Sequence, residues 1–369
     1  MKKHLNFYFP CIEDGGLEKN VFALVNSLAR KNYKINFFTY EDATKLKKLK
    51  KKFFFHKKIN VIESAFFFNI DRRYLKYLFC SLRLFFFCIF QKGTIVSFQG
   101  NVLPIIIAKI TSKKIIIRCN TAPSKYITNI YKKFFFKFIY SLSDLILVTS
   151  EDFKKEIKKY FYLNSQVHRQ SLDINNINRL SKYKFKFNFF ENFNGLKIIN
   201  VGRLTYQKDQ MTLLKAFKKL LKFKKSRLLL IGSGEDENKL KKFIKDQEIS
   251  KFVKFIAFTK NPFKYITKSD VKVLSSKFEG NPNILLEVAC LKKLIISSDC
   301  KVGPREILQA GKGGFLYKVG NHRKLCELLK NIKLSSKEIK NKIKISHDYV
   351  FKNYQKDISM SFINLTKDI

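Results

Sequence analysis

Short runs of apolar residues alternate along this chain with longer segments of helical periodicity. The predicted strands are 5–9, 35–40, 60–63, 94–98, 114–118 and 145–149 in the first half, and 197–202, 227–232, 253–258, 271–275 and 294–298 in the second. The predicted helices include 17–31, 72–90, 124–141, 151–161, 210–222, 235–246 and 283–291. Strands that alternate with helices form parallel sheets with helical crossover connections. The pattern therefore predicts an α/β fold.

A polar, aperiodic segment from about Asp173 to Asn194 interrupts this alternation, which then restarts. A chain of 369 residues is also longer than one ordinary domain. We predict two Rossmann-like domains, 1–185 and 195–345, and a terminal helical segment, 346–369, that packs back on the first domain. Ligands of such folds bind beyond the carboxyl ends of the strands. The predicted site is therefore an interdomain cleft that both parallel sheets face.

The formal net charge is +45, with 74 Lys and Arg against 29 Asp and Glu. A charge of this size suits nucleic acid or an anionic membrane as a partner. The Lys residues are spread over the whole chain, and no motif of a known nucleic-acid-binding module is present. We therefore expect no nucleic-acid partner. Two explanations stay open: contact with an anionic membrane surface, and an AT-rich genome whose codons favour Lys, Asn, Ile and Phe.

The seven Cys residues are odd in number and form no Cys-x-x-Cys pair. This usage predicts reduced, buried thiols in a cytoplasmic protein rather than disulfides or zinc ligands. The first residues lack the apolar run of a signal peptide and are expected to form a strand. Residues 75–90 are the strongest membrane candidate, but they are shorter than a membrane span and contain Arg83. They are predicted to form either a partly exposed core helix or a helix on a bilayer surface.

Two basic side chains follow the predicted strand 197–202. The apolar run ends at Gly202, and Arg203 and Lys208 lie just past the carboxyl end. The planar fork of Arg and the compact charge of Lys together suit the binding of a diphosphate. A basic pair after a strand is more often part of the solvated surface. Whether this pair binds a ligand therefore depends on the segments around it.

A second segment, 277–287, joins a loop carboxylate to the start of an apolar helix. Glu279 lies on the loop, and Pro282 precedes the first turn, where proline is tolerated. The N–H groups of that turn are predicted to bind phosphate; they belong to Asn283, Ile284 and Leu285. Glu287 stands one turn into a helix that is apolar nearly all round, so its carboxylate needs a partner. Ribose hydroxyls are the predicted partner.

These segments resemble the motifs of family 4 retaining glycosyltransferases of the GT-B fold. Glu279 and Glu287 stand in the family's Glu-x7-Glu pattern, inside Ser275-Ser-Lys-Phe-Glu-Gly-Asn-Pro-Asn-Ile-Leu-Leu-Glu. Val201-Gly-Arg-Leu with Gln207-Lys is similar to the diphosphate-binding segment, and Ile231-Gly-Ser-Gly to the glycine turn that follows. Ser298-Asp-Cys-Lys-Val-Gly-Pro-Arg-Glu-Ile-Leu is similar to a variant in enzymes of lipopolysaccharide and lipid-linked oligosaccharide assembly. Asp14-Gly-Gly-Leu-Glu looks like the glycine loop near the donor phosphates.

The resemblance implies a role for each matching residue. Arg203 and Lys208 would neutralise the diphosphate as it leaves the sugar. Glu279 would contact the transferred sugar, and Glu287 the ribose. The donor phosphates would approach the backbone closely at three glycines: Gly15, Gly16 and Gly232. Many relatives carry a His near the acceptor, whereas the corresponding stretch here, Ile117-Arg-Cys-Asn, has none.

The resemblance implies a retaining hexosyltransferase, and the basic residues of the predicted site favour a metal-independent one. The donor would be a nucleoside-diphosphate-sugar, with a UDP-sugar favoured, and the acceptor a glycan or polyprenyl-linked glycan in cell-surface polysaccharide synthesis. No cofactor or metal is expected, because the chain contains no Asp-x-Asp motif and offers basic groups for the phosphates. The predicted location is the cytoplasm, including the inner membrane face as a peripheral protein. The alternatives are a nucleotide-sugar epimerase of the same fold and a basic nucleic-acid-binding protein.

Overall fold

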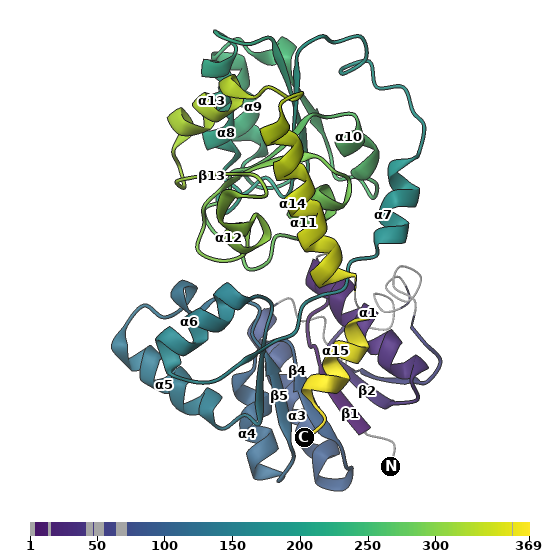
Figure 1. Ribbon diagram of the computed structural model, residues 1–369. Coiled ribbons are helices and arrows are strands. Elements are labelled where there is room, and N and C mark those ends of the chain that lie inside the picture. The colour runs from purple at the N-terminus through teal and green to yellow at the C-terminus, as the bar shows by residue number, and fades with distance from the viewer. Residues whose placement is uncertain (1–3, 14–15, 42–46, 48–54, 64–71, 356) are drawn as a thin grey trace. The chain divides into compact units, whose positions relative to one another are not determined.

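The chain divides into two compact units, each built around a parallel sheet (Figure 1). The computed structural model describes residues 4–13, 16–41, 47, 55–63, 72–355 and 357–369. Unit 1 comprises Met1–Ser171 and Lys356–Ile369, and unit 2 comprises Leu172–Gln355. The predicted pair of parallel α/β domains is confirmed.

The sheet of unit 1 has seven parallel strands within the described residues, in the order β3-β2-β1-β4-β5-β6-β7. Their bounds are β1 His4–Tyr8, β2 Lys34–Thr39, β3 Ile59–Glu63, β4 Thr94–Ser97, β5 Ile115–Arg118, β6 Leu145–Val148 and β7 Gln166–Val167. The helices are α1 Gly16–Arg30, α3 Arg73–Phe90, α4 Val102–Ile110, the 3-10 turn η1 Pro123–Lys125, α5 Ile130–Ser141, α6 Glu151–Phe161 and α15 Ile358–Leu365.

Two neighbouring residues of β2 show which helices cover which face of this sheet. Successive side chains of a strand point to opposite faces. The ring of Phe37 lies 5.7 Å from that of Phe22 in α1, and the ring of Phe38 lies 5.2 Å from that of Phe87 in α3. Helices α1 and α3 therefore cover opposite faces. Helix α15 packs against α1, and α4 packs against α3.

The sheet of unit 2 has six parallel strands, in the order β10-β9-β8-β11-β12-β13, and every residue of this unit is described. Their bounds are β8 Leu196–Val201, β9 Ser226–Ile231, β10 Val253–Ile256, β11 Val271–Leu274, β12 Leu294–Ser298 and β13 Phe315–Tyr317. The helices are α7 Ile174–Ser181, α8 Gln210–Leu220, α9 Glu237–Asp246, η2 Ser250–Phe252, α10 Phe263–Thr267, α11 Asn283–Cys290, α12 Pro304–Ile307, η3 Gln309–Gly311, α13 His322–Asn331 and α14 Lys337–Tyr354. Ile198 packs into the core beneath α8 and α13, and its neighbour Ile199 into the core beneath α11 and α14.

Side-chain caps fix where several helices begin. Ser150 accepts a hydrogen bond from the N–H of Phe153 at the start of α6. Asp209 caps α8 in the same way through Thr212, whose hydroxyl also donates to the Asp209 carboxylate at 2.7 Å. Such caps satisfy N–H groups that the first turn leaves without a partner. The Asp209 cap also fixes the backbone beside Lys208.

The borders of the units differ from the predicted ones at both ends of unit 2. Residues 172–185 belong to unit 2, because Ile174 and Ile177 of α7 are buried in its core. Helix α14 also lies in unit 2, where Val350 is buried. Only the segment that contains α15 packs on unit 1, through Ile358 and Phe362.

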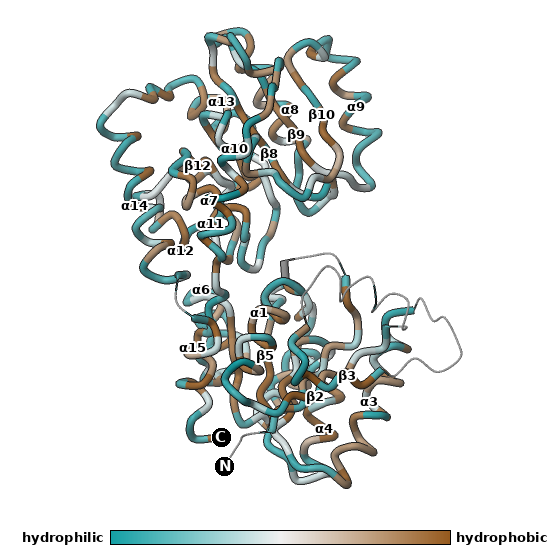
Figure 2. Tube along the Cα trace, turned by 90° about the vertical axis from the view of Figure 1, so that its right-hand side faces the viewer, coloured by the Kyte–Doolittle hydropathy of each residue, from teal (hydrophilic) through white to brown (hydrophobic). Residues whose placement is uncertain are grey.

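The described residues also bear on the thiols and on the membrane-span candidate. All seven Cys residues are free and buried, which confirms the expected reduced, buried thiols. Within the described segments, no helix has both the length and the hydropathy needed to cross a bilayer. The segment 75–90 forms most of α3, and Figure 2 shows apolar and polar positions interspersed along it.

Candidate functional site

The predicted site residues of unit 2 converge at the carboxyl ends of its strands. Lys208, in the segment after β8, places its Nζ atom 2.6 Å from Oε1 of Glu279, in the segment after β11. The hydroxyl of Ser276 donates to the same oxygen at 2.6 Å. Glu279 is only 9% exposed, so the pair is largely shielded from water. The Coulombic attraction within such a shielded ion pair is stronger than within one on the surface.

Three further hydrogen bonds hold these two segments together. The N–H of Lys277 donates to the carbonyl of Gln207 at 2.8 Å, and the side-chain amide of Gln207 donates to the carbonyl of Phe278 at 3.0 Å. The hydroxyl of Ser275 donates to the carbonyl of Lys208 at 2.8 Å. The arrangement around the ion pair is therefore built in before any ligand binds.

Arg203 lies near this cluster along the chain, but its side chain is exposed. Its carbonyl accepts a hydrogen bond from the side-chain amide of Gln210, buried at the start of α8, at 2.8 Å. The backbone of Arg203 is thus anchored while its guanidinium group is accessible to an anion.

Lys272, on β11, is a buried basic residue near this cluster that the sequence did not single out. Its side chain is fully buried, and its Nζ atom donates to the carbonyl of Val201 at 3.3 Å. Burial lowers the pKa of Lys272 well below its ordinary value, the charge of Lys208 lowers it further, and the carboxylates of Glu279 and Glu287 act in the opposite direction. The signal for it was a lysine inside the apolar run Val271-Lys-Val-Leu.

Gly232 sits where the turn after β9 meets the segment after β8. Its φ is +146°, and a Cβ atom there would lie 2.0 Å from the carbonyl oxygen of Gly202. Gly234 is similarly placed, with φ of +157° and a Cβ that would lie 2.3 Å from the carbonyl oxygen of Leu204. No side chain fits at either position. These glycines allow the backbone after β9 to contact the backbone after β8, on either side of Arg203.

Helix α11 begins at Asn283, as the sequence predicted, but one of its N–H groups is already used. The N–H of Leu285 donates to the carbonyl of Pro282 at 2.9 Å. A phosphate at Leu285 would have to share or displace this bond, and the predicted contact stays a prediction. Asn283 and Ile284 are half-buried at the start of the helix, and Glu287 is half-buried one turn in.

The predicted glycine loop of unit 1 is described only in part. Gly15 lies outside the described residues, as does most of the Lys-rich segment 45–58. Gly16 is the first residue of α1. Near the start of this helix, Glu18 is buried and accepts a hydrogen bond from the N–H of Glu13 at 3.2 Å.

A buried basic pair lies where the sequence analysis noted the absence of a His. Arg118, at the end of β5, is buried, and its Nη1 atom lies 2.7 Å from Nδ1 of His168. Nε2 of His168 lies 3.1 Å from the carbonyl oxygen of Ile358 in α15. Burial and the charge of Arg118 lower the pKa of His168 to about 3, so the ring is neutral. It therefore accepts from Arg118 at Nδ1 and donates from Nε2.

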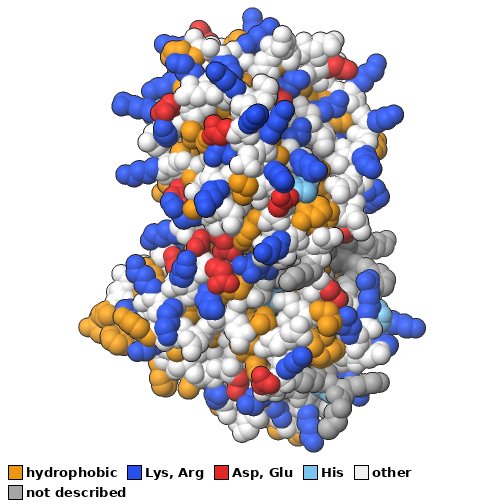
Figure 3. Space-filling view, viewed as in Figure 1, with side chains coloured by type: hydrophobic (Ala, Val, Ile, Leu, Met, Phe, Trp, Pro, Cys, Tyr) orange, Lys and Arg blue, Asp and Glu red, His pale blue; other side chains and the backbone are white. Residues whose placement is uncertain are grey.

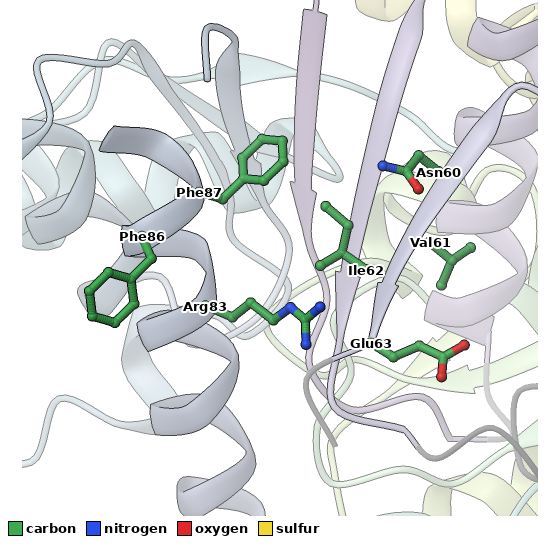
Figure 4. A pocket seen from close by; sticks show the side chains of 7 residues that line it. All are labelled: Asn60, Val61, Ile62, Glu63, Arg83, Phe86 and Phe87. Atoms are coloured by element: carbon green, nitrogen blue, oxygen red, sulfur yellow. The ribbon is translucent and has the colours of Figure 1, made fainter. Parts of the chain in front are cut away.

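Unit 1 also contains a pocket of about 610 Å³ between β3 and α3 (Figure 4). Arg83 points from α3 toward the strand, whereas Phe86 points away from it. Asn60 and Glu63 are the polar residues of the opposite wall. None of the predicted site residues that the structure describes lines this pocket.

Comparison with known proteins matches the segment that carries the ion pair. Residues 181–346 match the profile of the family glycosyl transferases group 1. An uncharacterised glycosyltransferase of Methanocaldococcus jannaschii is 33% identical over 197 residues, which cover 51% of this chain and 48% of that protein. A second relative, from Campylobacter jejuni, is 27% identical over 230 residues, which cover 60% of each chain. It is an N-acetylgalactosamine-N,N'-diacetylbacillosaminyl-diphospho-undecaprenol 4-alpha-N-acetylgalactosaminyltransferase.

The chain thus spans about half to three fifths of the length of these curated relatives. A solved structure covers more: that of Anabaena HepE in complex with UDP aligns over 100% of both chains, with a TM-score of 0.77 and 14% identity. The likeness at this identity concerns the fold. The chain therefore has the GT-B glycosyltransferase fold, and its residues 181–346 match the glycosyl transferases group 1 family.

Proposed function

We propose that this protein is a retaining glycosyltransferase that uses a nucleoside-diphosphate-sugar, with a UDP-sugar favoured. The observation that carries the proposal is the shielded Lys208–Glu279 ion pair at the carboxyl edge of the unit 2 sheet, inside the matched segment 181–346. The fold neighbour HepE was solved with UDP, which supports a uridine donor.

The proposed acceptor is a glycan, free or on a polyprenyl diphosphate, in cell-surface polysaccharide synthesis. The Campylobacter jejuni relative acts on a diphospho-undecaprenol-linked glycan by its name, which supports a lipid-linked acceptor. We place the reaction in the cytoplasm, at the inner membrane face.

In the proposed reaction the bond between the anomeric carbon and the diphosphate breaks while an acceptor oxygen bonds to that carbon on the same face. The acceptor proton passes to the leaving diphosphate, so no group of the protein is consumed. Lys208 and the accessible guanidinium of Arg203 would offset the charge that develops on the diphosphate. Glu279 would bind hydroxyls of the transferred sugar, and Glu287 those of the ribose.

Basic side chains at this edge support a reaction without a metal. Lys208, Lys272 and Arg203 all lie on or beside the strands that end here. Arg203 and Lys208 can offset phosphate charge directly, and Lys272 can do so once it has taken up a proton. Metal independence remains part of the proposal.

The test is a titration of the full chain with UDP, GDP and a nonspecific duplex at moderate salt, followed by a donor panel scored for sugar release. We expect a nucleoside diphosphate to bind and the duplex not to bind. Lys208→Met should weaken the binding roughly 10- to 150-fold. Lys251→Met, at an exposed lysine that precedes β10, should not weaken it. Conversion of a donor to its epimer without acceptor would favour the epimerase alternative instead.

A further inference from the structure

Helix α3 presents an apolar stripe to solvent instead of a polar one. Tyr74, Leu78, Leu82, Phe86 and Phe90 recur at four-residue steps, which places them on one face of the helix. All five are exposed, and Phe90 is 80% exposed. A surface helix ordinarily places charged and polar residues on its outer face. This stripe therefore lacks the cover expected in a protein surrounded only by water.

The apolar surface continues over the next two helices. Ile106 and Ile110 of α4 are exposed, as are Phe134, Phe135 and Phe138 of α5. Tyr131 of α5 is 81% exposed. Helix α4 packs against both α3 and α5. We call the exposed apolar residues of α3, α4 and α5 the apolar face; Figure 3 shows hydrophobic side chains gathered where Figure 1 places α5.

The same three helices carry positive charge only. Their sequences contain three Lys or Arg in α3, one in α4 and three in α5, and no Asp or Glu. Lys109 and Lys132 are exposed beside Ile110 and Tyr131. The Nζ atoms of Lys133 and Lys137 lie 5.5 and 5.4 Å from the ring centroid of the exposed Tyr162.

The combination of exposed apolar side chains and positive charge favours one kind of partner over the others that could cover the apolar face. A second copy of the chain would bring two faces of the same sign together, which is unfavourable. Single-stranded nucleic acid stacks on aromatic rings, but it leaves aliphatic side chains such as Leu78, Leu82 and Ile106 unpaired. An anionic bilayer takes both: apolar side chains enter the boundary between headgroups and acyl chains, while Lys and Arg meet the headgroups.

We propose that the apolar face docks unit 1 on an anionic membrane surface. The proposal concerns unit 1 alone and does not depend on the proposed reaction, because lipid binding is measured without donor or acceptor. It also differs from membrane crossing, since α3 lies on the sheet with Cys80, Leu84 and Cys88 buried beneath it.

The experiment is co-sedimentation of the full chain with vesicles of phosphatidylcholine, with and without phosphatidylglycerol, at low and high salt. We expect binding to the anionic vesicles at low salt, and loss of it on neutral vesicles and at high salt. The test variant is Phe134→Ser with Phe138→Ser, which we expect to lower the partition constant roughly tenfold. The matched control is Phe223→Ser with Phe252→Ser, at two exposed phenylalanines of unit 2, which should bind like the parent chain.

Hydrogen exchange identifies which helices contact the vesicles. Peptides from α3, α4 and α5 should gain protection on anionic vesicles, and peptides from α9 should not. Circular dichroism and thermal unfolding of the test variant, unchanged from the parent, verify that the chain is folded. Equal lipid binding by the test and control variants, or no binding to anionic vesicles, would overturn the proposal. So would a concentration-dependent dimer, or oligonucleotide binding, that the test variant abolishes.

Discussion

Lys208 and Glu279 are 71 residues apart in the sequence, yet Nζ of Lys208 lies 2.6 Å from Oε1 of Glu279. Ser276 donates to the same carboxylate oxygen, and Ser275 donates to the carbonyl of Lys208. The ion pair therefore belongs to a network that fixes both segments, and it pairs a phosphate-binding candidate with a sugar-binding one.

Replacing Lys208 with Met should weaken UDP or GDP binding strongly. A hydrogen bond to a charged group contributes about 1.5–3 kcal/mol, which corresponds to roughly 10- to 150-fold in affinity. The loss also leaves the Glu279 carboxylate shielded without a cation, which adds a stability cost. Calorimetric titration measures the affinity and thermal unfolding the stability. Parent-like affinity in Lys208→Met would remove this residue from the donor site.

Glu287→Ala should weaken nucleotide binding through the ribose. The expected loss is about 1.5–3 kcal/mol. The decisive comparison uses UDP and its 2′,3′-dideoxy analogue. The parent should discriminate between them, and the variant should bind both with similar weak affinity. A variant that still discriminates as the parent does would place the ribose elsewhere.

Lys272 should take up a proton when a nucleoside diphosphate binds. Its pKa is lowered by burial, so a nearby diphosphate, which favours the charged form, must raise it. Affinity should then fall as the pH rises from this lowered pKa toward the ordinary value for lysine. Titrations in two buffers of different ionisation enthalpy measure the uptake.

Lys272→Met should abolish that proton uptake and raise the melting temperature. The sign follows from linkage: a lysine with a lowered folded pKa costs stability at every pH below its unfolded pKa, because the unfolded chain holds the proton more tightly. A variant less stable than the parent would mean that the bond to Val201 outweighs this cost.

His168 should make unit 1 less stable in acid. The folded-state pKa is about 3, against an ordinary value of 6.5. As the pH falls from about 6.5 to 3, the unfolded chain gains a proton that the folded chain does not. Stability should therefore drop by about 1.4 kcal/mol per pH unit in this window. Urea unfolding followed by circular dichroism at pH 7 and pH 5 should show a smaller difference for His168→Gln than for the parent.

Catalysis should survive a strong chelator. The proposal meets the diphosphate charge with Arg203, Lys208 and Lys272, so EDTA is expected to leave the rate unchanged within experimental error. The measurement is sugar transfer after dialysis against EDTA, with and without added magnesium or manganese. Loss of activity that either metal restores would mean that these basic groups do not suffice.

The sequence predicted the sheets well because most of their strands are continuous apolar runs bounded by polar residues. It missed β7 and β13, which are edge strands of two and three residues. It also treated α7 as linker, because Ile174 and Ile177 are few among polar residues, although both are buried. Periodicity does not reveal burial when so few residues carry it.

The candidate site likewise contains residues that the sequence predicts and residues that only the folded structure reveals. Arg203, Lys208 and Glu279 could be predicted because each follows a strand, and parallel strands end at one edge. Lys272 stood out only as a lysine inside an apolar run, since its partners become visible only when β8 and β11 pair. The contact of Arg118 with His168, which is 50 residues away, likewise exists only in the folded chain.

The return of α15 to unit 1 has a consequence for synthesis on the ribosome. Phe362 packs its ring 6.4 Å from that of Phe7, and Ile358 supplies the carbonyl for His168. Unit 2 is synthesised before either residue is made, so β1 must wait for a helix that follows the whole of unit 2 in the sequence. The core of unit 1 therefore stays unfinished while unit 2 is synthesised, and we expect chaperones that shield apolar surface to bind nascent unit 1 during that interval.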